Sequence, residues 1–420
     1  MNKIVSRADQ ALSSHDLCDH CLGRLFAHVD TGTTNAERGR NMRIAVSLER
    51  SARSEELPAH EECWICEEIF DSLDRFADAC IAELSKIEYK TFLVGTKVSP
   101  DIQDREERLW AEVGGEDAEP IKAELNREIG KIMEARTQKE VDFKNPDAVT
   151  LVDTRFSHVE MTVTPLFIYG RYNKYSREIP QTIWPCRVCR GKGCERCNGL
   201  GKMYQTSVQE IIGDIAIKMA EGSDHFFHGM GREDIDARML GTGRPFVLEI
   251  SNPKKRSIDL NVLECESNKN EDASYSDLRF SSRDEVRKIK NASPDKTYSA
   301  TVSMQDKVNK GLVDEVLQSL SQACITQQTP VRVSHRRADL ARKRHIREIN
   351  LKDFSENSMV LEITAESGTY IRNSSVGMGA VQSLVSLKNS ASTAKLPRLM
   401  SYRYLITFTR YKNGQSFKRP

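Results

Sequence analysis

Eight of the eleven cysteines form four C-x-x-C pairs, a spacing that suits metal binding. The pairs are Cys18/Cys21, Cys63/Cys66, Cys186/Cys189 and Cys194/Cys197. A C-x-x-C turn lets two thiolates bind one ion at about 2.3 Å, and two such turns complete the tetrahedral shell of a structural zinc. In a reducing compartment this pattern indicates metal more often than disulfide. The first two pairs predict one zinc site, with unliganded core thiols or a redox pair as the alternatives.

The last two pairs lie in the segment CRVCRGKGCERCNGLGK and allow a second zinc site. Only four residues separate them, and Gly191 and Gly193 permit the tight reversal that a shared metal needs. The segment holds five cations against one glutamate, so it could also contact phosphate. A reduced, glycine-rich surface loop is the alternative. The phrase C-x-x-C-x-G-x-G is similar to the zinc region of DnaJ-type chaperones, but the further repeats and the J domain of those proteins are missing from this sequence.

Residues 228–246, HGMGREDIDARMLGTGRPF, combine glycines, arginines and acids between apolar segments. The glycines allow sharp turns and close approach to a ligand. On composition alone, a catalytic loop and a salt-bridged surface loop fit equally well. Walker, H-E-x-x-H and G-x-S-x-G motifs are missing from the sequence, so we expect neither a nucleotide cofactor nor a common hydrolase mechanism. The arginines that could bind phosphates or carboxylates are Arg232, Arg238 and Arg244, and the acids are Glu233, Asp234 and Asp236.

Three motifs together resemble one enzyme family. GRED followed by DARMLGTGRPF resembles the active-site loop of the archaeal and eukaryotic tRNA pseudouridine(54/55) synthases, which act on the T-loop. The resemblance implies that Asp234, two residues after Arg232, is the nucleophile and that Arg232 binds substrate. KTYSATV matches the motif whose aromatic residue, here Tyr298, stacks on the target base. GTYIR matches the late motif, in which Tyr370 lines the pocket and Arg372 pairs with the aspartate.

The resemblance covers nearly the whole chain. FLVGTKV, ELNREIGK, FKNPD, GRYNKYSREIPQTIWPC and the second cysteine cluster resemble the RNA-binding THUMP region of the same family. The implied fold class is α+β, with a zinc-stapled, THUMP-like α/β region followed by a catalytic domain built on a mixed or antiparallel sheet. The implied partner is the T-loop (TΨC) arm of tRNA, and catalysis needs no cofactor.

One segment departs from the family pattern. After GTYIR the family continues as E-F-V-H-G-D-x-G-R-T-x-P, whereas this chain reads NSSVGMGAVQSLVSL from Asn373. The Asp and Arg of that segment are missing, which affects substrate placement rather than the nucleophile. A zinc-containing tRNA-binding protein or RNA chaperone with impaired catalysis is therefore the second hypothesis, and a DnaJ-like metal chaperone is the third.

Hydrophobic periodicity predicts the elements that position these residues. Helices are expected over 65–84, 119–137 and 208–219, and strands over 91–94, 148–152, 159–163, 166–169, 245–250, 298–302, 346–350 and 359–364. A length of 420 residues suggests two to three domains. We expect a zinc-binding head at 1–66, a THUMP-like domain at 67–185, a cysteine-rich connector at 186–202 and the catalytic domain at 203–420.

Charge is balanced over the whole chain but not locally. Lys and Arg total 62 against 61 for Asp and Glu, which excludes a uniformly basic binder. Residues 332–347 hold seven Arg or Lys against Asp339 alone, a run that favours nucleic acid over a solvated face. Arg336 and Arg337 in this run are expected to bind substrate. GRYNKY at 170–175 suits either a platform for single-stranded RNA or an ordinary strand end.

Nothing in the sequence indicates a membrane protein. No apolar run approaches the roughly 18 residues that a membrane helix needs, and the first residues do not resemble a secretion signal. We expect a cytosolic monomer. The isolated Cys80, Cys265 and Cys324 are expected to be small buried hydrophobic residues.

Overall fold

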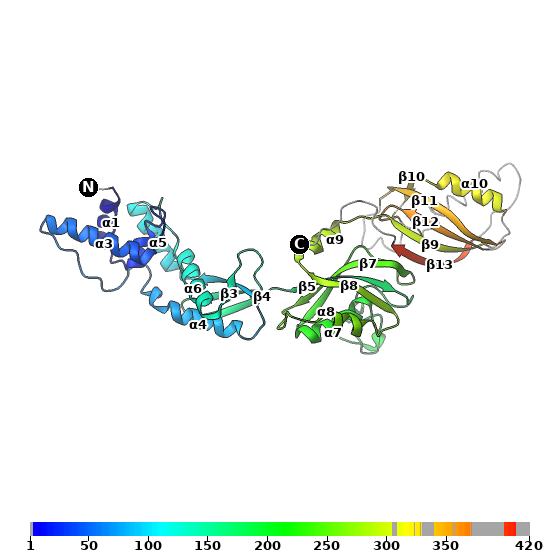
Figure 1. Cartoon of the computed structure of the whole chain (residues 1–420), viewed down its shortest axis with the longest axis horizontal. Helices are drawn as coiled ribbons and strands as arrows, with labels where there is room; N and C mark the ends of the chain where they lie inside the picture. Colours follow the sequence, from blue (N-terminus) through cyan, green and yellow to red (C-terminus); the bar gives the residue numbers. More distant parts are fainter. Residues whose placement is uncertain are drawn as a thin grey trace. The chain divides into compact units, whose positions relative to one another are not determined.

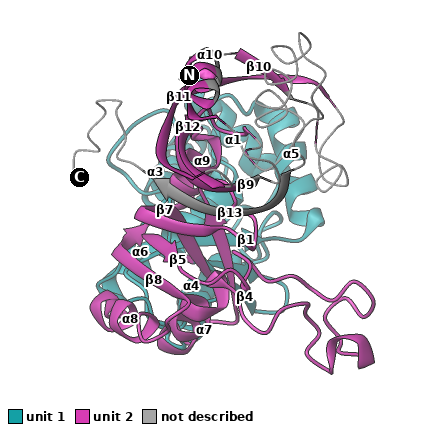
Figure 2. Cartoon of the chain, turned by 90° about the vertical axis from the view of Figure 1, so that its right-hand side faces the viewer, with its two compact units in different colours: residues 1–165, 252–257 teal, residues 166–251, 258–420 magenta. Residues whose placement is uncertain are grey.

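The computed structural model describes residues 3–304, 309–322, 324–327, 329, 340–355, 358–369, 371 and 399–408. The chain divides into two compact units, coloured separately in Figure 2. Unit 1 comprises Met1–Pro165 and Asn252–Ser257, and unit 2 comprises Leu166–Ser251 and Ile258–Pro420. Both combine helices with a sheet, as the α+β expectation requires. None of the helices in the described ranges has the length and hydrophobicity of a membrane-spanning segment.

Unit 1 starts with helices and continues into a small sheet (Figure 1). Its helices are α1 (Lys3–Ser14), α2 (Asp19–Arg24), α3 (Asn35–Ala52), the 3-10 helix η1 (Ile69–Ser72), α4 (Leu73–Leu84), α5 (Pro100–Val113) and α6 (Ile121–Thr137). Local signals set several of these starts. Thr34 and Glu37 form a capping box at α3, and Pro100 occupies the first turn of α5.

The sheet of unit 1 has the strand order β2-β1-β3-β4. Its strands are β1 (Thr91–Lys97), β2 (Glu140–Val141), β3 (Ala148–Asp153) and β4 (His158–Val163). Strand β1 is parallel to β2 and β3, and β4 is antiparallel to β3. Burial alternates along β1, so one face of the sheet is covered. Phe76 of α4 and Ile129 of α6 pack there against Phe92.

The helix predicted over 65–84 begins later than expected. Glu67 and Glu68 have φ of 51° and 57°, in the left-handed region, and the chain becomes regular only at η1. The reason is local. Cys63 and Cys66 turn the chain into a thiol cluster, so Ile65, the one periodic apolar residue before Ile69, lies in that turn instead of in a helix.

Unit 2 is built on one nine-stranded sheet of order β10-β11-β12-β9-β13-β7-β5-β8, with β6 paired to β7. The strands are β5 (Leu166–Lys174), β6 (Asp224–Gly229), β7 (Arg238–Ser251), β8 (Ala273–Ser281), β9 (Lys296–Met304), β10 (Cys324–Gln327), β11 (Arg342–Ser355), β12 (Ser358–Ala365) and β13 (Leu399–Phe408). All pairings are antiparallel except that between β13 and β7, so the sheet is mixed.

Helices cover both faces of this sheet. The α-helices of unit 2 are α7 (Val208–Ala220), α8 (Leu260–Ser267), α9 (Arg283–Asn291) and α10 (Lys310–Leu320), and the 3-10 helix η2 (Glu195–Cys197) lies in the cysteine-rich segment. Ile168 of β5 packs in one apolar cluster with Ile212 of α7, whereas the adjacent Phe167 packs with Val286 of α9. Because neighbouring residues of a strand point to opposite faces, α7 and α9 lie on opposite sides.

The structure corrects one expectation about organisation. The strand expected at 166–169, inside the 67–185 segment, is part of β5, which lies between β7 and β8 in unit 2 because its inward residues pack with α7. The four-part division of the chain otherwise stays a prediction.

The isolated cysteines only partly follow the expectation that they are buried. Cys80 is buried, but Cys265 and Cys324 are exposed. Cys265 lies on the side of α8 opposite to its buried residues, and Cys324 lies in the edge strand β10.

Candidate active site

Asp234 lies in the connection between the antiparallel strands β6 and β7, a segment that we call the Asp234 loop (residues 230–237). Its side chain is half-buried, and its carbonyl accepts a hydrogen bond of 3.1 Å from the Ala237 amide. The loop depends on Gly231, which has φ of 75° and whose added Cβ would lie 3.2 Å from Nζ of Lys296. Both the left-handed backbone and the close approach favour glycine at this position.

A buried lysine holds the backbone of the loop. Lys174, the last residue of β5, is fully buried. Its ammonium group donates to the carbonyl oxygens of Ile179 at 3.1 Å, Asp234 at 3.5 Å and Ile235 at 2.5 Å. Burial lowers the pKa of Lys174 to about 8, and the charges of Glu233 and Asp236 oppose that change. Lys174 is therefore charged at neutral pH and connects the sheet to the peptide groups at Asp234.

A buried polar network holds the residue before Asp234. The Glu233 carboxylate accepts a hydrogen bond of 2.8 Å from the Tyr172 hydroxyl and pairs with Arg244 at 3.0 Å. The side chains of Glu233 and Arg244 are each 1% exposed. Gln181 donates to the Tyr172 hydroxyl at 2.8 Å and to the Gly231 carbonyl at 3.0 Å. Buried charges persist when they are paired and hydrogen-bonded, so this network gives the loop one conformation.

Of the two partners expected for Arg244, phosphate or carboxylate, the structure gives a carboxylate of the chain itself. Arg244 faces Tyr172 in the β5–β7 register and is buried beside Glu233, so it neutralises a buried carboxylate. Arg232 and Arg238 are exposed. The Arg232 guanidinium lies 4.9 Å from the centre of the Trp184 ring, a cation–π contact that orients it at the surface.

Tyr298 lies in β9, opposite Ile363 of β12, and is 9% exposed. It belongs to the same apolar cluster as Tyr172 and Phe246. Its pKa is raised to about 12, mainly by burial and further by the negative charge of Asp234, while Arg244 opposes the rise. Tyr298 thus lies within electrostatic reach of both Asp234 and Arg244.

Four of the predicted site residues lie outside the described residues: Tyr370, Arg372, Arg336 and Arg337. The end of the basic run is described in β11. There Lys343 and Arg347 are exposed, with Arg347 paired to Asp295 at 3.1 Å, and Arg344 lies 3.7 Å from Glu366. This part of the run is partly neutralised by the chain itself.

The sequence did not point to Lys174 or Tyr172 as residues under the loop. Because both are buried, the interpretation of 170–175 as an exposed RNA platform is wrong, and the strand-end alternative holds. The signal was available in the alternation of β5. Ile168, Tyr172 and Lys174 share one face of the strand, so a lysine occupies a position where the pattern requires an apolar residue.

The first cysteine cluster brings together Cys18, Cys21, Cys63 and Cys66, all buried, with sulfurs within 4.8 Å of one another. Sulfurs at about 2.3 Å from a tetrahedral zinc would be about 3.8 Å apart, and Cys18 and Cys66 are separated by 3.6 Å. Burial raises the pKa of Cys21, while hydrogen bonds from the neighbouring thiols hold the pKa of Cys63 far below its usual range. Without a cation only one of the four thiols is favoured as a thiolate, and a bound metal ion would stabilise the other three, so the four-sulfur donor set fits a metal.

The second cluster has the same geometry. Cys186 and Cys194 are 3.8 Å apart, as are Cys189 and Cys197. The amides of Gly193 and Gly201 each donate to a cysteine sulfur at 3.2 Å, which favours thiolates. Both glycines have positive φ, and a Cβ on Gly201 would lie 2.4 Å from the Gly191 carbonyl oxygen. Both predicted sets of four cysteines therefore come together and could hold a metal ion.

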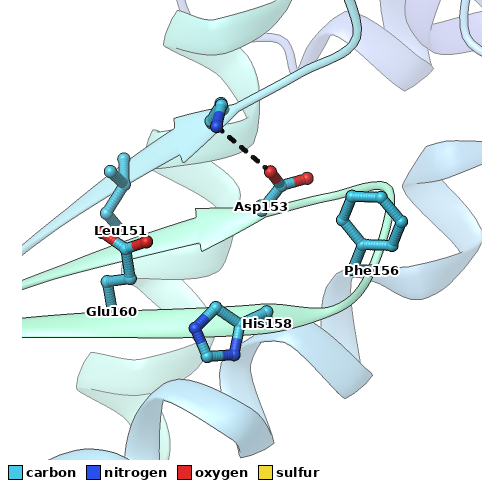
Figure 3. A pocket seen from close by; sticks show the side chains of 6 residues that line it. Leu151, Asp153, Phe156, His158 and Glu160 are labelled. Carbon is cyan, nitrogen blue, oxygen red and sulfur yellow. Dashed lines mark ion pairs between the residues drawn. The ribbon is translucent and has the colours of Figure 1, made fainter.

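Unit 1 carries a shallow pocket of about 260 Å³ on β3 and β4 (Figure 3). Its lining is Lys97, Leu151, Asp153, Phe156, His158 and Glu160. Lys97 and Asp153 form an ion pair of 3.5 Å across it. None of the predicted site residues that the structure describes lines this pocket.

Comparison with known proteins agrees with these features. Residues 76–153 match the family model for the Pus10 THUMP domain, archaeal, and residues 167–379 match the model for Pus10, C-terminal. The matches confirm a THUMP domain and the expected family of the C-terminal region. The THUMP match ends at residue 153, so GRYNKYSREIPQTIWPC and the second cysteine cluster, which were expected in the THUMP region, fall in the C-terminal match instead. A chain of a Cbf5-Nop10-Gar1 crystal structure aligns with 48% of this chain and 48% of its own length at 14% identity, but the TM-score of 0.26 supports no conclusion.

Curated relatives extend the match over most of the chain. The tRNA pseudouridine synthase Pus10 of Methanothermobacter marburgensis is 42% identical over 88% of this chain and 90% of its own length. The proteins of the same name from Methanothrix thermoacetophila and Methanopyrus kandleri are 40% and 38% identical over 88% of this chain, covering 87% and 91% of their own lengths. The chain therefore belongs to the Pus10 family.

Proposed function

We propose that this chain isomerises uridine to pseudouridine in the T-loop of tRNA, at position 54, 55 or both, with Asp234 as the nucleophile. The names of its curated relatives support the reaction class. The assignment of Asp234 rests mainly on one observation. Asp234 is a half-buried carboxylate in a loop that Lys174 and Glu233 anchor from the buried side, within electrostatic reach of Tyr298.

The reaction is an isomerisation that balances without a cofactor. The bond between N1 of uracil and C1′ of ribose breaks, the base turns, and a bond between C5 and C1′ forms. C5 loses a proton and N1 gains one. The Asp234 carboxylate would attack the nucleotide or stabilise the sugar cation, and its fixed backbone would keep it beside C1′.

Tyr298 would stack on the turned base and relay the C5 proton. Its pKa of about 12 keeps the phenol protonated at neutral pH, so the hydroxyl remains a hydrogen-bond donor. Arg372 is proposed as the partner of Asp234 and Tyr370 as a wall of the pocket, both from the match of GTYIR to the family motif.

Exposing a base in a folded tRNA loop costs a few kcal/mol of free energy, which binding must offset. Contacts between exposed cations and phosphates would provide this binding free energy. Arg232 is exposed and oriented by Trp184, and Arg336 and Arg337 are proposed to act with it. Neither cysteine cluster takes part in the chemistry. We propose that both hold structural zinc, because their sulfur separations of 3.6–3.8 Å suit a tetrahedral ion.

The cysteines also support a cytosolic location. Eight of them are paired for metal binding, a use typical of reducing compartments. The chain is proposed to act there as a monomer. Light scattering of the purified chain at micromolar concentration should give the mass of one copy, 47.6 kDa, and a stable dimer would contradict this point.

The decisive experiment compares Asp234→Asn with Asp236→Asn, a matched change in the same loop. Unmodified transcribed tRNA is incubated with each protein, and pseudouridine is mapped at single-nucleotide resolution. We expect Asp234→Asn to form no pseudouridine at any enzyme concentration while binding tRNA within about twofold of the parent, and Asp236→Asn to retain activity.

Two outcomes would contradict the proposal. Full activity of Asp234→Asn would remove this residue as nucleophile. No pseudouridine from the parent chain would favour the tRNA-binding protein or RNA chaperone, a hypothesis motivated by the divergent segment from Asn373.

A further inference from the structure

Residues 185–202, which we call the cysteine loop, form a compact projection without long regular elements. Its base is closed by a β-bridge between Pro185 and Lys202, and its only helical turn is η2. Inside it, the sulfurs of Cys194 and Cys197 lie 3.7 Å apart and the four thiols form one cluster. Such a loop has a shape fixed by its cluster and its glycines, so its outward side chains are presented on a rigid support.

The outward side chains are cationic and without carboxylate partners. Arg187, Arg190, Lys192 and Arg196 are all exposed, and none of them is paired with an acid within the described part of the chain. Several exposed arginines elsewhere are paired with an acid. Arg287 lies 2.8 Å from Asp284 and Arg108 lies 3.1 Å from Glu112.

The four cations of the cysteine loop repel one another, which raises the free energy of the folded chain. Four cations surround one exposed acid, Glu195, in a chain whose net charge is only +1. Like charges held close together repel unless a polyanion faces them. A zinc bound by four thiolates would carry a charge of about −2, which compensates part of this excess. The remaining positive charge points to an external anion.

The base of the cysteine loop is joined to the candidate active site. Trp184 precedes the loop, and its ring lies 4.9 Å from the guanidinium of Arg232, two residues before Asp234. Tyr204 follows the loop and packs edge-on against Trp184 at 5.6 Å. The Met203 amide donates to the Trp184 carbonyl at 2.9 Å. The same residues therefore anchor the cysteine loop and orient an exposed arginine of the Asp234 loop.

We propose that the cysteine loop is a second RNA-binding surface, whose Arg187, Arg190, Lys192 and Arg196 bind phosphates of the substrate RNA beside the nucleotide that enters the site of Asp234. This inference rests on the proposed function, since it takes the substrate to be RNA. It adds a surface on a separate segment of the chain from the basic run that ends in β11.

The test uses the full chain with all four cations changed to glutamine: Arg187→Gln, Arg190→Gln, Lys192→Gln and Arg196→Gln. The matched control changes four exposed cations of α9: Arg283→Gln, Arg287→Gln, Lys288→Gln and Lys290→Gln. Both variants lose four positive charges from unit 2. A third variant, with Arg187→Lys, Arg190→Lys and Arg196→Lys, keeps the charge.

Binding of transcribed tRNA is measured by filter binding at several salt concentrations. We expect the glutamine variant to bind at least tenfold more weakly at low salt, with a salt slope shallower by about 0.7–0.9 for each phosphate that the loop no longer neutralises. The α9 control should change affinity by less than threefold, and the lysine variant should bind nearly as well as the parent. Pseudouridine formation should need more tRNA for half-maximal rate but reach a similar maximum.

Zinc content and thermal unfolding are measured on the same proteins. Loss of zinc from the glutamine variant with unchanged tRNA affinity would overturn the proposal, because the cations would then serve only to neutralise the cluster. Equal loss of affinity in the α9 control would also overturn it, since net charge alone would explain the effect. These results differ from failure of the proposed function, in which the parent chain forms no pseudouridine at any tRNA concentration.

Discussion

Asp234 is positioned by residues that we do not expect to touch the substrate. Lys174 donates to the peptide carbonyl of Asp234 from the buried side, and Glu233, next to it, is fixed by Tyr172 and Arg244. Buried ionised groups are costly unless their hydrogen bonds are satisfied. Their presence here indicates that the chain gives up some stability to hold a short loop in one conformation.

Lys174→Met is expected to lower the maximal rate more than it changes the half-saturating tRNA concentration, because the backbone at Asp234 loses its anchor. Three carbonyl groups would also lose their donor, at a cost of about 1–3 kcal/mol in the free energy of unfolding. Urea unfolding and steady-state kinetics measure both effects. Lys290→Met, on the exposed side of α9, is the control and should change neither.

The pKa of Lys174 adds a pH signature. Burial lowers it from 10.5 to about 8, so between these values the unfolded chain holds a proton that the folded chain has released. The contribution of this residue to the free energy of unfolding therefore rises from pH 8 to 10.5. Activity should fall over the same range, since a neutral amine has fewer N–H groups for the carbonyls. Identical pH profiles for the parent and Lys174→Met would contradict this role.

Among the helices and strands, the first cysteine cluster stabilises helices of unit 1 that are too short to be stable by themselves. Helix α2 has six residues, too few to be stable alone, and Cys18 caps its start. Arg24, in its last turn, donates to the Cys21 sulfur at 3.1 Å and pairs with Glu124 at 3.3 Å. The negative charges of Cys21, Glu106 and Glu124 raise the pKa of Arg24 against the effect of burial. The cluster and this buried arginine connect α2 to α5 and α6.

Cys63→Ser is expected to reduce zinc from two ions per chain to one and to unfold the region around α1–α3, because structural zinc contributes on the order of 10 kcal/mol to such a fold. Elemental analysis gives the metal content, and hydrogen exchange over residues 3–70 reports the unfolding. Cys265→Ser, at an exposed isolated cysteine, should leave both unchanged. Full protection of residues 3–70 after complete chelation would show that zinc is not needed there.

At the scale of the whole molecule, the two units are not consecutive in sequence. The chain passes from unit 1 to unit 2 after Pro165, returns for Asn252–Ser257, and then enters unit 2 again. The returning segment is well bonded within unit 1. Arg256 lies 2.9 Å from Asp147 and donates to the Thr164 carbonyl at 2.7 Å, and the Glu88 amide donates to the Lys254 carbonyl at 2.7 Å. A simple truncation at residue 165 would leave this segment without its partners.

Arg256→Ala is expected to free the 252–257 segment and to destabilise unit 1 by about 1–3 kcal/mol, since Asp147 and Thr164 lose a partly buried donor. Limited proteolysis should then cut within 252–257 at least several times faster than in the parent. Lys254→Ala is the control, because that exposed side chain can be removed while the backbone hydrogen bond remains. Equal cleavage rates in both variants would contradict the anchoring role.

Features that depend on local spacing could be predicted from the amino-acid sequence. The four C-x-x-C pairs identify the thiols that gather in space, because each pair closes within one turn of chain. The glycines and acids of residues 228–237 identify a tight loop, and ordered motifs identify the family. The alternation of β5 predicted a strand but not its sheet.

The residues that hold the Asp234 loop could be identified only from the folded chain. Lys174, Tyr172 and Arg244 meet beneath Asp234 because β5 pairs with β7 in one register, and Tyr298 comes from β9, on the other side of β13. Strand pairing is non-local, and a shift of one residue would turn each side chain to the opposite face. The alternation of β5 indicates that Lys174 faces inward, but the groups that Lys174 and Arg244 contact depend on the register, so the sequence does not identify them.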